Sequence, residues 1–161
     1  MRVAVILAEG SGECLRLGQE YVPKLLLPLG GKPLLEHQLA WLSASGFETV
    51  ILCLGYKADR VRAHFGDGSR WGVRLRYSVE EAPLGTAGSV KTLGAASLPE
   101  DILVLHGEVY GELDCRKMID AHASHQGLAT LAVQPAASNC TRGLVVMGRS
   151  EERRVGKECR L

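Results

Sequence analysis

The chain has 161 residues, of which 46% are hydrophobic and 23% charged, and its formal net charge is +1. This is the composition of a single soluble globular domain, and it lacks the basic excess of a nucleic-acid-binding protein. No apolar run approaches the ~20 residues that a membrane span needs.

The N-terminus and the cysteines indicate the compartment. The first apolar run ends at Glu9 and is too short for a signal peptide. The five cysteines are widely spaced and form no CxxC pair, which favours a reducing environment over a disulfide framework or a zinc site. We therefore expect a cytoplasmic protein.

Aliphatic runs and helical patterns alternate along the chain. Continuous aliphatic runs predict buried strands at residues 3–7, 49–54 and 101–107, an alternating pattern predicts a strand at 73–79, and a last strand is predicted at 128–135. Helical spacing predicts helices at the following residues: 33–45, 57–65, 86–96 and 114–125.

This alternation predicts a doubly wound α/β domain with a mostly parallel sheet. In such sheets ligands bind at the carboxyl ends of the strands. The candidate ligand-binding loops are therefore residues 8–23, 55–57, 80–88 and 107–114.

The C-terminal segment differs from the rest of the chain. Residues 149–161, "RSEERRVGKECRL", contain five Lys or Arg and three Glu without an apolar period. The segment resembles the in-frame translation of a sequencing-library adapter. We expect residues 1–148 to form an incomplete domain, truncated at the C-terminus, and residues 149–161 to be a non-native or disordered tail without function.

A glycine-rich loop, "LAEGSGECLRLG", follows the first strand at residues 7–18. Gly10 and Gly12 match two glycines of a dinucleotide-binding G-x-G-x-x-G, but Leu15 is too bulky for the third. The second strand ends in "LCLGYK", which offers no acidic residue to hold a ribose, and no G-K-[ST] follows the loop. A Rossmann dehydrogenase and a P-loop are thus poorly supported.

Four sequence motifs downstream of this loop indicate what it is. They are "PKLLLPLGGKP", "FGDGSRW", "PLGTAG" and "LVLHGEVYGELD". In this order they resemble the sugar-1-phosphate nucleotidylyltransferases, especially the guanylyltransferases that act on mannose or heptose 1-phosphates, from Met1 to about Gly148. The resemblance implies a Rossmann-like, GT-A-like fold. It also implies the joining of an NTP to a sugar 1-phosphate, with release of pyrophosphate and use of Mg²⁺.

The resemblance assigns the phosphate-handling residues. Leu7, Ala8, Gly10 and Gly12 match the nucleotide loop, whose backbone N–H groups can cradle a triphosphate. Lys24 matches the family's catalytic lysine, which neutralises phosphate charge.

The resemblance also assigns the base and metal sites. Gly85 and Thr86 match a segment that passes close to the base, and a carboxylate of Glu80 or Glu81 could accept N–H groups of guanine, which favours GTP. Glu108 occupies the place of an aspartate that binds magnesium.

Three residues of the loop depart from the family pattern L-A-G-G-x-G-T-R. Glu9 replaces a glycine, Glu13 a threonine, and Cys14 the arginine that contacts the triphosphate. Two added carboxylates and a lost guanidinium should repel nucleotide phosphates. Glu9 would also be strained if the family's glycine has a positive φ there.

Two functions stay open at this point. The first is a nucleotidyltransferase with impaired activity, whose partners are a nucleoside triphosphate and a sugar 1-phosphate. The second is a non-catalytic nucleotidyltransferase-like module for ligand sensing or assembly. Neither involves nucleic acid or a membrane, and a homo-oligomer stays open for both.

Overall fold

The computed structural model describes residues 2–10, 16–17, 20–82, 84–111, 113–125, 127–133, 144–147 and 152–155. The chain divides into two compact units, Met1–Glu112 and Leu113–Leu161. The first unit contains the parallel sheet and all the candidate site residues.

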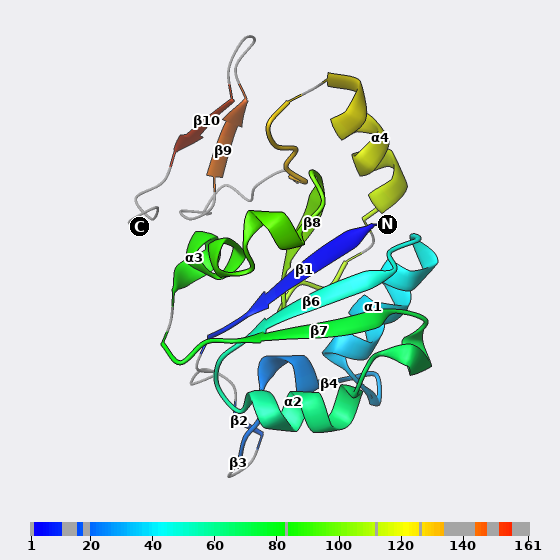
Figure 1. Cartoon of the computed structure of the whole chain (residues 1–161), viewed down its shortest axis with the longest axis vertical. Coiled ribbons are helices and arrows are strands. Elements are labelled where there is room, and N and C mark those ends of the chain that lie inside the picture. Colours follow the sequence, from blue (N-terminus) through cyan, green and yellow to red (C-terminus); the bar gives the residue numbers. More distant parts are fainter. Residues whose placement is uncertain are drawn as a thin grey trace. The chain divides into compact units, whose positions relative to one another are not determined.

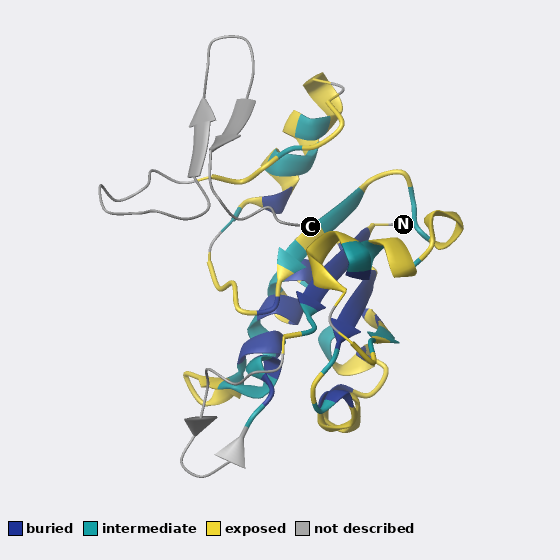
Figure 2. Ribbon diagram, turned by 90° about the vertical axis from the view of Figure 1, so that its left-hand side faces the viewer, coloured by how far each residue is buried: buried dark blue, intermediate teal, exposed yellow. Residues whose placement is uncertain are grey.

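Four parallel strands form the sheet, in the spatial order β7-β6-β1-β8 (Figure 1). Their bounds are β1 (Val3–Ala8), β6 (Thr49–Leu54), β7 (Arg74–Val79) and β8 (Ile102–His106). The two central strands, β1 and β6, are almost wholly buried (Figure 2), which explains their continuous aliphatic sequences. All four strands were predicted from sequence, and the fold class is confirmed.

Helices cover both faces of the sheet. The chain passes from β1 through α1 (Leu34–Ala44) to β6 and through α2 (Ala58–Phe65) to β7, and then returns through α3 (Gly85–Thr92) to β8. Because such crossovers are right-handed, the reversal places α3 on the face opposite α1 and α2 (Figure 1). Accordingly, Val90 of α3 packs against a buried cluster. The cluster is formed by alternate residues of the two central strands: Val3, Val5, Leu7, Ile51 and Cys53.

Short elements connect these layers. They are β2 (Arg16–Leu17) paired with β3 (Glu20–Tyr21), β4 (Pro28–Leu29) paired with β5 (Lys32–Pro33), and the 3-10 turns η1 (Lys24–Leu26), η2 (Ser69–Trp71) and η3 (Ala95–Ser97).

The third helix is shorter than the sequence predicts. The expected helix 86–96 starts one residue earlier and ends at Thr92. Gly94 has a φ of +74°, a conformation that terminates a helix and that glycine adopts without strain.

The second unit begins with α4 (Cys115–His125). Asp114 caps this helix, since its Oδ1 accepts the backbone N–H groups of Lys117 and Arg116, each at 3.1 Å. These bonds, led by that of Lys117, hold the pKa of the Asp114 carboxyl below its usual value. A hairpin of β9 (Leu144–Met147) and β10 (Glu152–Val155) follows later in the chain.

One strand predicted in this unit is absent from the described residues. Residues 128–133 form no strand, although their sequence is apolar. Leu128, Leu131 and Val133 are exposed, so this segment lacks the buried face that stabilises a strand. The interpretation of residues 149–161 as a non-native tail stays a prediction.

Among the described residues no helix is both long and apolar enough to cross a membrane.

Candidate functional site

The carboxyl ends of the four strands meet at one edge of the sheet. The register pairs Ala8 with Leu54, Leu54 with Val79, and Leu7 with His106. The loops that leave these residues therefore lie side by side. The order of the strands switches at β1, because β6 and β7 lie on one side of it and β8 lies on the other. The crevice at such a switch point is the usual ligand site of an α/β sheet.

The loops pack closely on one another at this edge. A Cβ added to Gly55, after β6, would lie 2.5 Å from the carbonyl oxygen of Glu9. Gly107, after β8, donates its N–H to the Leu7 carbonyl at 2.8 Å, and a Cβ there would lie 2.9 Å from Leu25 Cδ2. Only glycine allows these approaches, so both glycines set the shape of the site.

Lys24 lies between two predicted site residues. Its Nζ is 3.5 Å from Glu108 Oε1 and 3.4 Å from the position that a Cβ on Gly10 would take. The Lys24 side chain is 24% exposed and that of Glu108 is 52% exposed. The structure thus brings the proposed catalytic lysine, a loop glycine and the proposed metal ligand to one place.

Leu25 holds this lysine in position. Leu25 is only 1% exposed. It lies close to Gly107 and so packs η1 against the loop after β8. An apolar packing residue therefore stands next to Lys24 in the chain.

The structure distinguishes the two carboxylates proposed near the base. Glu80 follows β7, and its Oε2 accepts the N–H of Leu84 at 3.4 Å. Its Oε1 is buried and has no hydrogen-bond partner within the described part of the chain. Glu81 is exposed. Of the two, Glu80 is therefore the carboxylate that the fold holds in place and leaves with one unpaired oxygen.

The electrostatic environment of the edge is acidic. Burial, and after it the charges of Glu80 and Glu9, raise the pKa of the Cys53 thiol to about 12. Both carboxylates thus act on the end of β6, and Glu108 adds a third negative charge to the edge. Cys53 is neutral at physiological pH and is no nucleophile.

The remaining nucleotide-binding candidates differ in exposure. Gly85 and Thr86 begin α3 and are exposed, and Gly85 has a φ of +72°. Ala8 is half-buried, whereas the Leu7 side chain is 2% exposed and packs in the core, so only its backbone could meet a ligand. Gly12 lies outside the described residues, as do Glu13 and Cys14.

Glu9 is not strained. Among the described non-glycine residues only Lys57 has a positive φ, of +52°, so the strain that was considered for Glu9 does not occur. Glu9 therefore affects this site through its charge alone.

Sequence reasoning missed Gln38 at this edge, and it included Lys57 in a candidate loop without indicating its backbone conformation. Gln38, on α1, is 4% exposed and donates to backbone carbonyls of the loop that carries Glu108. Lys57 precedes α2 in the left-handed conformation and brings a cation to the loop after β6. Strained backbone of this kind concentrates at functional sites, but no pattern in the sequence reveals it.

One motif of the family resemblance lies away from this edge. "FGDGSRWG" connects α2 to the amino end of β7. Asp67 Oδ1 accepts the N–H of Ser69 at 3.0 Å, and the Trp71 ring lies 5.0 Å from that of Phe65. The motif therefore forms a turn that positions β7.

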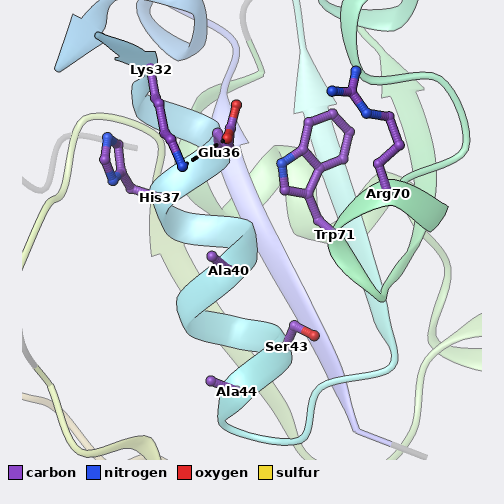
Figure 3. Close-up of a pocket in the computed structure, with 8 residues that line it drawn as sticks. All are labelled: Lys32, Glu36, His37, Ala40, Ser43, Ala44, Arg70 and Trp71. Carbon is purple, nitrogen blue, oxygen red and sulfur yellow. Dashed lines mark ion pairs between the residues drawn. The ribbon is translucent and has the colours of Figure 1, made fainter. Parts of the chain in front are cut away.

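A separate groove runs along the outer side of α1 (Figure 3). Its volume is about 540 Å³. Lys32 and Glu36 form an ion pair of 3.5 Å at one end, and Arg70 and Trp71 lie across from the helix. No candidate site residue lines this groove.

Glu108 fits a magnesium ligand of the kind that phosphate-transfer sites use. No group of three or more His, Cys, Asp or Glu within the described ranges could hold a metal ion alone. Mg²⁺ at such sites usually takes one or two carboxylates, and substrate phosphates and waters supply the other ligands. A half-exposed carboxylate at the end of β8 meets this requirement.

Comparison with known proteins agrees with the fold. A family model described as "Nucleotidyl transferase" matches residues 3–157. The chain belongs to this family. Its relatives place it among the sugar-1-phosphate nucleotidyltransferases, which confirms the resemblance carried by the sequence motifs.

Three similar proteins illustrate this relationship. D-glycero-alpha-D-manno-heptose 1-phosphate guanylyltransferase of Aneurinibacillus thermoaerophilus is 34% identical over 82% of this chain and 57% of its own length. Mannose-1-phosphate guanylyltransferase of Mycobacterium tuberculosis is 36% identical over 85% of this chain and 39% of its own. The crystal structure of HddC from Yersinia pseudotuberculosis complexed with GMP-PN matches with a TM-score of 0.65 and 31% identity, over 76% of this chain and 54% of that one. The chain thus spans about half the length of the relatives it matches.

Proposed function

We propose that this chain joins GTP to a sugar 1-phosphate and releases pyrophosphate. One observation carries the proposal: Lys24 Nζ lies beside Gly10 and 3.5 Å from Glu108, at the edge where the family's ligands are expected. Two similar proteins are named as guanylyltransferases of sugar 1-phosphates, which supports the same reaction class.

The reaction is an in-line displacement. An oxygen of the sugar phosphate forms a bond to the α-phosphorus of GTP, and the bond from that phosphorus to the bridging oxygen of pyrophosphate breaks. Catalysis of such a step is mostly positioning and neutralisation of charge. The Lys24 ammonium is the cation placed to stabilise the developing negative charge, with backbone N–H groups of the loop around Gly10.

A magnesium ion held by Glu108 would neutralise phosphate charge and orient the triphosphate. In the described structure the Glu108 carboxylate is paired with Lys24, so both residues are already oriented towards the same space. The cation and the carboxylate can therefore act on one phosphate group.

Glu80 supports the choice of GTP. Its buried Oε1 lacks a partner among the described residues, and an unpaired buried acceptor favours a ligand that supplies a donor. Guanine presents adjacent N1–H and N2–H donors, whereas cytosine and uracil lack this pair. Glu80, rather than the exposed Glu81, is the residue that we assign to base recognition.

We further propose that the activity is impaired by the charge of the nucleotide loop. Glu9 lies close enough to Cys53 to affect its pKa, so its carboxylate faces the same edge as Glu80. Each like-charge contact with phosphate costs about 1 kcal/mol near a protein surface, or roughly a fivefold loss in affinity. This acidic edge is also the observation that favours the second candidate, a non-catalytic module that senses ligands or supports assembly.

The test is an assay of nucleotide-sugar formation and pyrophosphate release. GTP, CTP, UTP and dTTP are each supplied with mannose 1-phosphate or a heptose 1-phosphate and Mg²⁺. We expect product with GTP, and about a hundredfold lower kcat/KM in Lys24→Met, as for the loss of a group that stabilises transition-state charge. Lys91→Met, at an exposed position of α3, is the matched control.

A chain carrying Glu9→Gly, Glu13→Thr, Cys14→Arg and Glu108→Asp tests the impairment. We expect it to be faster than the natural sequence with the same substrates. If the natural chain and the substituted chain both bind GTP and neither forms product, the result would favour the non-catalytic module. Absence of both binding and turnover in the two chains would overturn both candidates.

A further inference from the structure

Gln38 is a polar residue at a core position. It lies on the buried side of α1, where its neighbours are leucines, and it is 4% exposed. The buried face of this helix consists of Leu34, Leu35, Gln38, Leu39 and Leu42. Buried glutamine is uncommon without a hydrogen-bonding role.

The side-chain amide of Gln38 binds a single turn. Its Nε2 donates to the carbonyl oxygen of Val109 at 2.7 Å and lies 3.3 Å and 3.4 Å from those of His106 and Gly107. The N–H of Val109 donates back to the His106 carbonyl at 3.1 Å and closes this turn. Glu108 is one of its two central residues.

The other end of the Gln38 amide is not satisfied. Its Oε1 is buried and has no hydrogen-bond partner among the residues that the structure describes. A buried acceptor left unpaired is destabilising, and a methionine or leucine would fill the same space without that cost. The favourable contribution of this amide therefore comes from the turn that its N–H groups hold.

The turn is fixed on two sides. On the β1 side, the Gly107 N–H binds the Leu7 carbonyl, and Leu25 leaves no room for a side chain at Gly107. On the α1 side, Gln38 holds the carbonyls. The Glu108 side chain leaves the turn between these two attachments and meets Lys24.

We propose that Gln38 is a positioning residue that fixes the turn 106–109 and thereby the carboxylate of Glu108 relative to Lys24. The expected effect of Gln38 on the Mg²⁺ requirement rests on the proposed nucleotidyl transfer. The anchoring of the turn by Gln38 does not. Gln38 touches no reacting atom and acts through Glu108.

The first test measures the turn itself by NMR. Gln38→Met keeps the length of the side chain and removes its N–H donors. Leu42→Met is the matched control, because Leu42 is buried on the same face of α1 and its aliphatic side chain has no donor for the turn. We expect the order parameter of the Glu108 amide to fall from about 0.85 to below about 0.6 in Gln38→Met alone. Hydrogen exchange of the Val109 amide should become about tenfold faster or more, because the turn loses an anchoring hydrogen bond.

Unchanged order and exchange in a folded Gln38→Met chain would overturn the proposal. If this variant does not fold, the natural chain gives the answer instead. The side-chain N–H₂ of Gln38 should then exchange at least about tenfold more slowly than that of free glutamine, because its hydrogens are bound and buried. Exchange as fast as in free glutamine would refute the anchoring.

The second test uses the Mg²⁺ dependence of nucleotide-sugar formation. We expect Gln38→Met to raise the Mg²⁺ concentration for half-maximal rate about fivefold or more, with the KM for sugar 1-phosphate within about twofold. Excess Mg²⁺ should restore the rate. A lower kcat at unchanged Mg²⁺ requirement would refute the action through Glu108. If the natural chain forms no product, the proposed function fails, and the NMR result still decides the anchoring.

Discussion

The Cys53 thiol is neutral because it is buried and lies near two carboxylates. Its pKa is raised to about 12 from the ordinary 9.0, first by burial and then by Glu80 and Glu9. A thiol that keeps its proton in the folded state stabilises that state below the pKa of the unfolded chain. This contribution is lost as pH rises from about 9 towards 12.

We therefore predict that Cys53 makes stability fall with rising pH. The difference in the free energy of unfolding between the natural chain and Cys53→Ala should shrink between pH 8 and pH 10.5, since alanine does not ionise. Urea unfolding of both chains at each pH measures this difference. A constant difference across the range would contradict the shifted pKa.

Individual site residues were predictable to different degrees. Lys24, Gly10 and Glu108 were predicted from the resemblance of the surrounding motifs to those of the family, and the structure brings them together. Gln38 could have been noticed as a polar residue at an apolar helical position. Its role could not, because its partners lie 68 to 71 residues away and are backbone atoms without sequence identity.

At the scale of elements, the turn before β7 depends on glycines in two different ways. Gly68 has a φ of +83°, and a Cβ there would lie 2.6 Å from Leu75 Cγ and 2.8 Å from the Val73 carbonyl oxygen. Gly66 has a φ of +55°, but a Cβ there would meet nothing within 4 Å. The first glycine is needed for space and conformation, and the second for conformation alone.

We predict unequal costs for alanine at these two positions. Gly68→Ala should destabilise the chain by about 3 kcal/mol, the sum of left-handed strain and overpacking. Gly66→Ala should cost less, about 2 kcal/mol, from backbone strain alone, because its φ of +55° is combined with a ψ of −129°. The midpoints of urea unfolding measure both, and equal losses would mean that the contact at Gly68 relaxes freely.

The elements themselves were largely predictable because parallel strands are buried on both faces and read as continuous aliphatic runs. The errors occurred where the sequence stayed apolar but the backbone changed. Gly94 ends α3 early, and residues 128–133 are apolar yet exposed. Hydrophobicity reports burial only where a partner surface exists, and a local pattern does not contain the partner.

At the scale of the whole molecule, the first unit is organised around two strands with neighbours on both sides. β1 lies between β6 and β8, and β6 lies between β1 and β7. β7 and β8 have one neighbouring strand each within the described residues. The backbone amides of β1 and β6 are therefore the most completely hydrogen-bonded of the sheet.

Native-state hydrogen exchange should show this order. We predict that the amides of Val5 and Ile51 exchange only through global unfolding, whereas alternate amides of β7 and β8 exchange through smaller openings. The slope of exchange free energy against urea, measured by NMR, separates the two classes. Slopes as large in β8 as in β1 would contradict this hierarchy.

Both tryptophans precede the amino ends of strands, at the opposite side of the sheet from the ligand edge. Trp41 belongs to the last turns of α1, and Trp71 to η2, at the amino end of β7. Tryptophan fluorescence should accordingly change when the sheet and its helices unfold. It should change very little when a nucleotide binds. A tryptophan introduced at exposed Tyr110, in the loop after β8, would supply the missing optical reporter of site occupancy.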